Sequence, residues 1–165
     1  MKKIVYQALK PLAGLPLRVI GRSSNMLWLS FGDPRVVSDR DRSAKAVLDW
    51  TIQIQCPWRI SQNGRIVIAY RDFYYSDVPL KNVDVMSKSR SNSVLDTLST
   101  EFETNPPRVA SVETDDTGNF SIHLGNGYCL EVFPAESTES GKLWRIFEPV
   151  AQGRSFVFPP SDTQD

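Results

Sequence analysis

One run of residues, from Trp50 to Ile60, limits what this chain can fold into more than any other feature of the sequence. Polar side chains occupy most of its odd positions. Its even positions are apolar: Trp50, Ile52, Ile54, Cys56, Trp58 and Ile60. Successive side chains of a β-strand point to opposite faces, so the pattern predicts a long strand with one face in the core. Pro57 lacks an amide hydrogen, and the strand is therefore expected to lie at a sheet edge or to carry a bulge there.

Turn residues divide much of the remaining chain into further strands. Asn63-Gly64 is a strong signal for a two-residue hairpin, which predicts antiparallel pairing of the strands on either side of it. Asn126-Gly127 gives the same signal within a series of apolar runs after residue 108, where we expect a continuous meander. Leu17 to Phe31 predicts an opening hairpin. The charged residues from Asp33 to Lys45 show no alternation and are expected to form a loop.

Two helices are expected beside these strands. The first runs from Lys2 to Lys10 and is ended by Pro11. Its predicted packing side comprises Ile4, Val5, Ala8 and Leu9. The second runs from about 92 to 104, where Ser93 and Asp96 resemble a capping box. Its predicted buried stripe comprises Leu95, Leu98 and Phe102.

The fold class expected from these elements is α+β, a mainly antiparallel sheet of hairpins and meander. A short N-terminal helix precedes the sheet, and the helix near 92–104 packs on its apolar face. The chain has 165 residues, of which 41% are hydrophobic, and this is enough for a single domain with one core, which we expect to span residues 1–160. We expect residues 161–165 to form a disordered tail.

Composition favours a cytoplasmic protein without bound cofactors. The apolar stretch from Ile4 to Ile20 is interrupted by polar residues and prolines, so we expect no membrane span and no signal peptide. Two cysteines, Cys56 and Cys129, cannot build a disulfide framework, and buried free thiols are favoured over a redox pair or a metal site. The single histidine, His123, offers no spacing typical of a zinc site, so no metal site is predicted.

No motif of a common enzyme class occurs in the chain: neither a phosphate-binding loop, nor a dinucleotide glycine pattern, nor a nucleophile elbow. His123 falls on the polar face of its predicted strand. It has no serine, cysteine or acid at a recognisable motif spacing, which argues against a general base. No catalytic residue is therefore predicted, and a non-enzymatic role is favoured.

Charge is unevenly divided although the formal net charge is zero. Residues 1–90 carry 15 Lys+Arg and 7 Asp+Glu, a balance of +8, whereas residues 91–165 carry 4 and 12, a balance of −8. One interpretation is a basic face for nucleic acid or an acidic partner. The other, which we favour, is that strands of the two halves interleave and their charges pair, because the basic residues form neither a run nor a helical stripe.

The tripeptide Trp-Arg-Ile occurs twice, around Arg59 and Arg145, each time within a predicted strand. Alternation sends each arginine to the face opposite its tryptophan and isoleucine. If both strands belong to one sheet, Arg59 and Arg145 can share a surface with Gln53 and Gln55 that binds a carboxylate or phosphate. The alternative, which we favour, is that each arginine pairs with an internal acid. The acids considered are Asp49, Asp72 and Glu131.

A second group of candidate binding residues follows the strand after Gly64: Arg71, Asp72, Phe73, Tyr74 and Tyr75. Aromatic side chains grouped at a strand end suit a protein interface. They are equally suited to covering the end of the core, and the sequence does not separate the two interpretations.

Five strings occur in order between Asn25 and Phe147: NMLWLSFGD, IQCPWRI, GRIVIAYRD, GYCLEVFP and LWRIF. Their arrangement resembles that of an uncharacterised family of small bacterial single-domain proteins. The resemblance implies no catalytic residue, cofactor or substrate. In size, β-rich layout and lack of catalytic motifs, the chain is also similar to the immunity proteins encoded beside bacterial polymorphic toxins, which is an analogy of style.

Three functions remain, in order of preference. The first is a non-enzymatic cytoplasmic protein that binds a macromolecular partner, in one version an immunity protein whose partner is a toxin. The second is a small anionic-ligand-binding protein or enzyme that uses Arg59 and Arg145, assisted by Glu131 or His123. The third is nucleic-acid binding through the basic N-terminal half, which the dispersed charges disfavour.

Overall fold

The alternating run from Trp50 to Ile60 is where the two main sheets of the fold meet. The computed structural model describes residues 1–38, 44–74, 90–137 and 141–161. In it, β5 (Trp50–Ile54) and β6 (Trp58–Gln62) belong to different five-stranded antiparallel sheets. The prediction of one continuous strand is therefore wrong, because the three residues ending in Pro57 link the sheets. The predicted facing is confirmed, since all six apolar residues are at most 7% exposed.

The first sheet, named sheet I, has the strand order β1-β2-β5-β11-β12. Its other strands are β1 (Leu17–Ser23), β2 (Met26–Phe31), β11 (Trp144–Phe147) and β12 (Ser155–Phe158). The predicted β1–β2 hairpin is confirmed. The continuous meander is wrong at its end, because β11 leaves the neighbouring strands of the last third and pairs with β5 and β12.

The second sheet, named sheet II, has the order β7-β6-β10-β9-β8. Its other strands are β7 (Arg65–Ala69), β8 (Val109–Thr114), β9 (Phe120–Leu124) and β10 (Tyr128–Val132). One sheet thus runs from the hairpin at Gly64 to the meander at Gly127, as predicted. Asn63 and Gly64 both have positive φ, as a two-residue hairpin turn requires. The second turn is a three-residue turn, η3 (Gly125–Gly127), instead of the predicted two.

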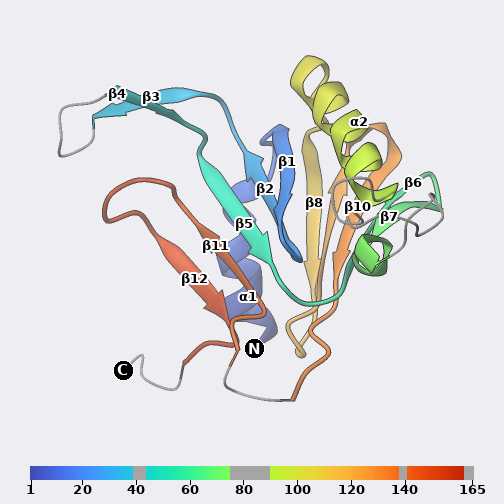
Figure 1. Ribbon diagram of the computed structural model, residues 1–165. Coiled ribbons are helices and arrows are strands. Elements are labelled where there is room, and N and C mark those ends of the chain that lie inside the picture. Colours follow the sequence, from blue (N-terminus) through green and yellow to red (C-terminus); the bar gives the residue numbers. More distant parts are fainter. Residues whose placement is uncertain (39–43, 75–89, 138–140, 162–165) are drawn as a thin grey trace.

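A two-stranded ribbon projects from one end of sheet I (Figure 1). It consists of β3 (Arg35–Ser38) and β4 (Ala44–Val47), which pair antiparallel. The expectation of a loop is therefore wrong for these residues. Alternation is absent because most of the ribbon is exposed on both faces: Val36 is 72% exposed, and Val47, at the end of β4 next to sheet I, is its one buried residue.

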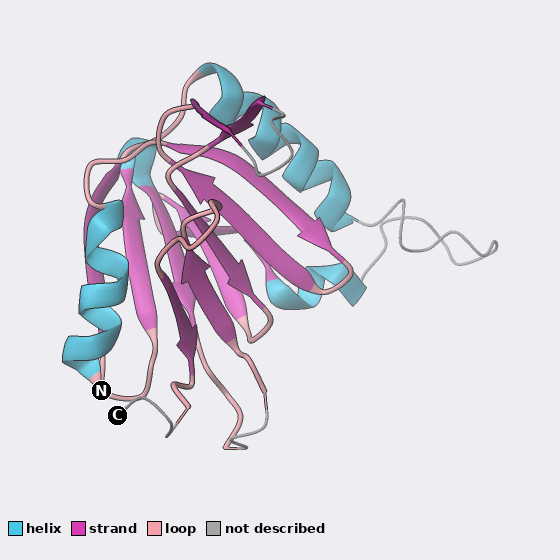
Figure 2. Ribbon diagram, turned by 90° about the vertical axis from the view of Figure 1, so that its left-hand side faces the viewer, coloured by secondary structure: helices cyan, strands magenta, loops and turns pink. Residues whose placement is uncertain are grey.

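Two α-helices lie on different sides of the sheets (Figure 2). In α1 (Lys2–Leu9), Val5 and Leu9 are buried, but Ile4 is 53% exposed and does not belong to the packing side. A 3-10 turn, η1 (Lys10–Leu12), follows it and contains Pro11.

The second helix, α2 (Arg90–Thr104), packs against β1 and β7. The predicted stripe is confirmed, because Leu95, Leu98 and Phe102 are buried. The capping box is wrong: Ser93 lies inside the helix, where its carbonyl accepts a hydrogen bond of 3.0 Å from the Thr97 hydroxyl. The end of the helix before Asn105 agrees with the prediction.

The inner faces of the two sheets share one hydrophobic core. Trp144 of sheet I lies edge-on to Phe120 of sheet II, with ring centroids 4.9 Å apart, and stacks on Phe158 at 5.5 Å. Its Nε1 donates a hydrogen bond of 3.3 Å to the carbonyl of Gly118. A Cβ at Gly118, where φ is +85°, would meet the Phe158 ring, so only glycine fits.

No helix in the described part of the chain has both the length and the apolar composition that crossing a bilayer requires.

Candidate binding face on sheet I

The two arginines of the repeated tripeptide lie on the outer faces of different sheets. Arg59 is on β6 of sheet II and Arg145 is on β11 of sheet I. Their neighbours within each tripeptide are buried, so both arginines face outward as alternation predicts. The condition for a site shared by Arg59 and Arg145, that both strands belong to one sheet, is not met.

Arg59 forms an ion pair within sheet II. Its Nη2 donates a hydrogen bond of 2.8 Å to Glu131 Oε1, and its Nε donates one to Oε2, which makes a forked ion pair. The hydrogen bonds from Arg59 hold the pKa of Glu131 below its usual range, while the same contact raises the pKa of Arg59. The guanidinium also lies over the Phe133 ring, 5.3 Å from its centroid. Internal pairing, the favoured alternative in the sequence, therefore describes Arg59.

Arg145 has a different environment. Its Nε donates a hydrogen bond of 2.6 Å to Gln53 Oε1, and its guanidinium lies over the Phe147 ring at 4.7 Å from the centroid. In the described part of the chain, no carboxylate lies within ion-pair distance of Arg145. The amide of Gln53 is a neutral acceptor, so it orients the guanidinium without neutralising it.

A shallow pocket of about 290 Å³ opens beside Arg145 on the outer side of sheet I. The described residues that line it come from three neighbouring strands, the residue after β5 and the segment before β11: Met26, Gln53, Gln55, Lys142, Trp144 and Arg145. Two of them are cations, two are amides, and none is acidic. The pocket thus contains part of the group considered from the sequence, Arg145 with Gln53 and Gln55, but not Arg59.

The pocket belongs to a larger surface, which we name the sheet I face. It is formed by the outward side chains of β2, β5 and β11 together with the residue after β5: Met26, Trp28, Ser30, Thr51, Gln53, Gln55, Arg145 and Phe147. Most of these side chains are half-buried, and none is acidic. Strand pairing places Trp28, Gln53 and Arg145 in one row across the sheet. A Cβ at Gly21 would meet the indole of Trp28, so glycine lets this ring approach the backbone of β1 closely.

The structure describes only part of the candidate binding group after β7. Phe73 lies in the 3-10 helix η2 (Tyr70–Tyr74) and is buried edge-on to Trp58, with centroids 5.6 Å apart. Asp72 accepts a hydrogen bond of 2.8 Å from the amide of Ala69, and Arg71 is exposed. Phe73 thus covers the end of the core. Tyr75 and the side chain of Tyr74 lie outside the described residues.

The thiols and the histidine form no reactive group in the described residues. Burial raises the pKa of the Cys56 thiol to about 12, and burial also raises the pKa of Cys129. Both thiols are free, and Cys129 is only half-buried, unlike the buried thiol that was expected. His123 lies on the outer face of sheet II, with its Nε2 3.7 Å from Glu113 Oε1. No group of three or more potential metal ligands occurs in the described parts of the chain.

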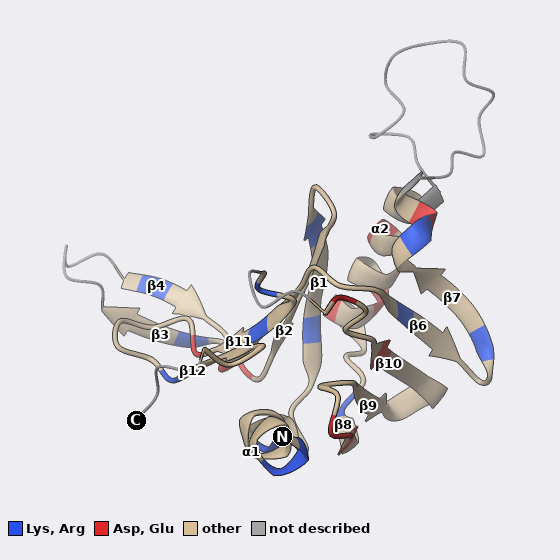
Figure 3. Cartoon of the chain, turned by 90° about the horizontal axis from the view of Figure 1, so that it is seen from below, with Lys and Arg blue, Asp and Glu red and all other residues tan. Residues whose placement is uncertain are grey.

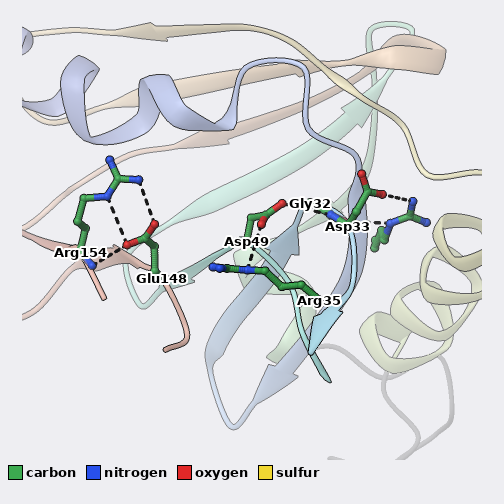
Figure 4. Close-up of polar contacts among 7 residues, drawn as sticks. Gly32, Asp33, Arg35, Asp49, Glu148 and Arg154 are labelled. Carbon is green, nitrogen blue, oxygen red and sulfur yellow. Dashed lines mark hydrogen bonds and ion pairs between the residues drawn. The ribbon is translucent and has the colours of Figure 1, made fainter. Parts of the chain in front are cut away.

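Both sheets combine strands from the basic and the acidic half of the chain, as the favoured interpretation of the charge division predicts. Basic and acidic segments lie side by side in β6 and β10 (Figure 3), where Arg59 meets Glu131. Other pairs stay within one half: Arg154 binds Glu148 across 3.0 Å (Figure 4). Interleaving of the strands is therefore confirmed, whereas pairing of charges between the halves is only partial.

Charged residues also fix the base of the β3–β4 ribbon (Figure 4). Asp49 accepts a hydrogen bond from the amide of Asp33 and lies 3.3 Å from Arg35 Nε. Arg18 binds both the Asp33 carboxylate, at 2.7 Å, and the carbonyl of Gly32. A Cβ at Gly32, where φ is +106°, would collide with the Asp49 carboxylate. This group therefore holds the direction in which the ribbon leaves the sheet.

Comparison with known proteins gives no relative from which a function can be transferred. No protein-family model, curated protein or solved structure matches the chain. The site therefore rests on its own residues. Sequence reasoning missed Met26, Trp28, Phe147 and Lys142, although the alternation of "NMLWLS" already placed Met26 and Trp28 on one face.

We expect the Arg59–Glu131 pair to stabilise the protein at neutral pH and to lose this stabilisation in acid. The folded-state pKa of Glu131 is lowered, so its stabilisation is complete above the unfolded pKa of about 4.3 and is lost as the pH falls through the folded value. The free energy of unfolding, measured with urea at pH 7 and pH 3, should therefore fall less in Glu131→Gln than in the wild type. Glu103→Gln, which removes an exposed carboxylate, serves as the control and should keep the wild-type difference. Equal differences in all three proteins would contradict the assignment.

Proposed function

We propose that the protein is a non-enzymatic cytoplasmic binding protein that docks a macromolecular partner on the sheet I face. The observation that carries this proposal is a face with two half-buried aromatic side chains, Trp28 and Phe147, and with Arg145, which no acid in the described part of the chain neutralises; none of the residues that form the face is acidic. Tryptophan, phenylalanine, methionine and arginine are the residues that protein interfaces favour. The absence of acids suits a partner whose docking surface is acidic.

The outer face of sheet II supports this role less well. Arg59 is neutralised there by Glu131, and Glu113 and His123 lie on β8 and β9 of the same sheet. A partner that docked there would have to compete with an existing forked ion pair. The sheet I face, in contrast, offers a guanidinium already held in place by Gln53 and Phe147.

Two further candidate functions receive less support. Nucleic-acid binding through the basic half would need many free cations on one surface, but Arg18 and Arg35 are paired with Asp33 and Asp49. An enzyme would need an activated group, and the raised pKa of Cys56 keeps that thiol protonated. The immunity version of the proposal, in which the partner is a toxin, rests on this binding face and on the similarity to immunity proteins in size, β-rich layout and lack of catalytic motifs.

The phenylalanines beneath the two arginines offer a matched test. Phe147→Ala alters the sheet I face, whereas Phe133→Ala removes the equivalent ring under Arg59 on sheet II. We expect a partner captured from native host cells by the wild type to be captured equally by Phe133→Ala and about ten-fold less by Phe147→Ala. Identification of that partner by mass spectrometry then tests the toxin version directly.

The proposed function is wrong if no protein is captured specifically by the wild type. It is also wrong if Phe133→Ala loses the partner while Phe147→Ala keeps it, because the interface would then lie on sheet II. Circular dichroism and thermal unfolding of both variants confirm that each retains its fold before the capture is compared.

A further inference from the structure

The repeated tripeptide provides a comparison within one molecule. Arg59 and Arg145 both point outward from a strand next to the edge strand of its sheet, each lies over a phenylalanine ring, and each donates from Nε to a cross-strand partner. They differ in the partner, which is the carboxylate of Glu131 for Arg59 and the amide of Gln53 for Arg145. Replacing a charged acceptor by a neutral one leaves the positive charge of Arg145 available.

The geometry also leaves the binding edge of Arg145 available. The Nε–H of Arg145 donates to Gln53, and the guanidinium lies over the Phe147 ring. In the described structure, the two Nη groups of Arg145 donate no hydrogen bond. These groups form the end of the guanidinium fork, which matches the two oxygens of a carboxylate.

The pocket supplies further groups for the same ligand. Lys142 provides a second cation, Gln55 provides an amide that can donate, and Met26 provides an apolar wall. Among the described residues that line the pocket none is acidic, so a bound anion would meet no like charge from them. Preorganisation of Arg145 reduces the conformational entropy lost on binding.

We propose that this pocket binds a carboxylate side chain from an acidic segment of the protein partner. The inference rests on the proposed function and specifies which chemical group the sheet I face recognises. A protein segment is favoured over a nucleic acid because the described lining of the pocket holds two cations and Arg145 lies over the Phe147 ring, which suits an apolar neighbour of an acidic side chain. A free phosphate ion shares the requirement for an anion and is separated by the test below.

The test is an NMR titration of the full chain, labelled with ¹⁵N, using hexaglutamate and inorganic phosphate as separate probes. We expect hexaglutamate to shift the Arg145 Nε–H resonance and the backbone amides of β5 and β11, and to do so more strongly than phosphate at equal charge concentration. Dissociation constants come from the concentration dependence of these shifts at low ionic strength.

Three variants separate the pocket from a general attraction of anions. Arg145→Gln removes the fork, and Gln53→Glu converts the pair into the internal ion pair seen at Arg59, so we expect each to weaken hexaglutamate binding about ten-fold or more. Gln53→Glu retains the Arg145 side chain, and it distinguishes loss of charge from loss of structure. Arg59→Gln removes one cation from sheet II and should leave the affinity unchanged.

The proposal is overturned if hexaglutamate shifts no resonance in β5 or β11, if only phosphate binds there, or if Gln53→Glu binds hexaglutamate as well as the wild type does. These outcomes differ from failure of the proposed function, which is judged by capture of a protein on the sheet I face. Loss of a captured partner in Phe147→Ala but not in Arg145→Gln would retain the docking face and reject the carboxylate pocket.

Discussion

Replacing Trp144 by alanine is expected to lower the free energy of unfolding by about 3–5 kcal/mol. The indole is 1% exposed; it contacts Phe120 of sheet II across the core and packs against Phe156 and Phe158 of the neighbouring strand in sheet I. Its removal leaves a cavity between the sheets, and it also leaves the carbonyl of Gly118 without its donor. Urea unfolding of the wild type and the variant measures the loss.

The tryptophan of the other tripeptide offers a control for this effect. Trp58 is also buried, but within the described residues its Nε1 has no hydrogen-bond partner. Trp58→Phe should therefore cost less than Trp144→Phe, because it removes an unsatisfied donor and Trp144→Phe breaks a hydrogen bond. A larger loss in Trp58→Phe would show that the bond to Gly118 contributes little.

Ile54→Ala is expected to lower the free energy of unfolding by about 2–5 kcal/mol. Ile54 is 0% exposed on the inner face of β5, where it pairs with Leu27 and Trp144 on the neighbouring strands. Gln55→Ala is the matched control, since the next side chain along the chain is exposed. Equal losses for the two variants, measured by chemical denaturation, would contradict the inward orientation of the even-numbered residues, because a one-residue slip exchanges the faces.

Local patterns in the sequence predicted most individual elements. The Asn63-Gly64 signal gave the β6–β7 hairpin, and the spacing of Leu95, Leu98 and Phe102 gave the buried side of α2. These features depend on residues close together in the chain. Alternation from Trp50 to Ile60 likewise gave the correct inner face for every residue in the run.

The division of that run between two sheets was not predictable from its pattern. Alternation records which side chains are buried, and it remains unbroken whether or not the strand changes its neighbours. Pro57 marked an interruption of the ladder, but an edge, a bulge and a link between sheets all place a proline without a hydrogen-bonded amide. The placement of β11 beside β5 depends on contacts about 90 residues apart in the sequence, which no local signal encodes.

The candidate site was predicted in part for the same reason. Alternation placed Arg145, Gln53 and Gln55 on outward faces, but whether Arg59 joined them depended on the strand order. The sequence also contained Glu131 and Gln53, whose difference in charge gives the two arginines different roles. That difference became meaningful only when pairing showed which arginine each of them meets.

The link between β5 and β6 has a consequence for how the molecule comes apart. Three residues join β5, the central strand of sheet I, to β6, the strand beside edge strand β7 in sheet II, and the buried side of the run is the same on both sides of the link. If β5 moved by one residue, β6 would be drawn along and its side chains would change faces as well. We therefore expect the two sheets to open together, so that amide hydrogen exchange in β5 and β6 proceeds through one cooperative unit.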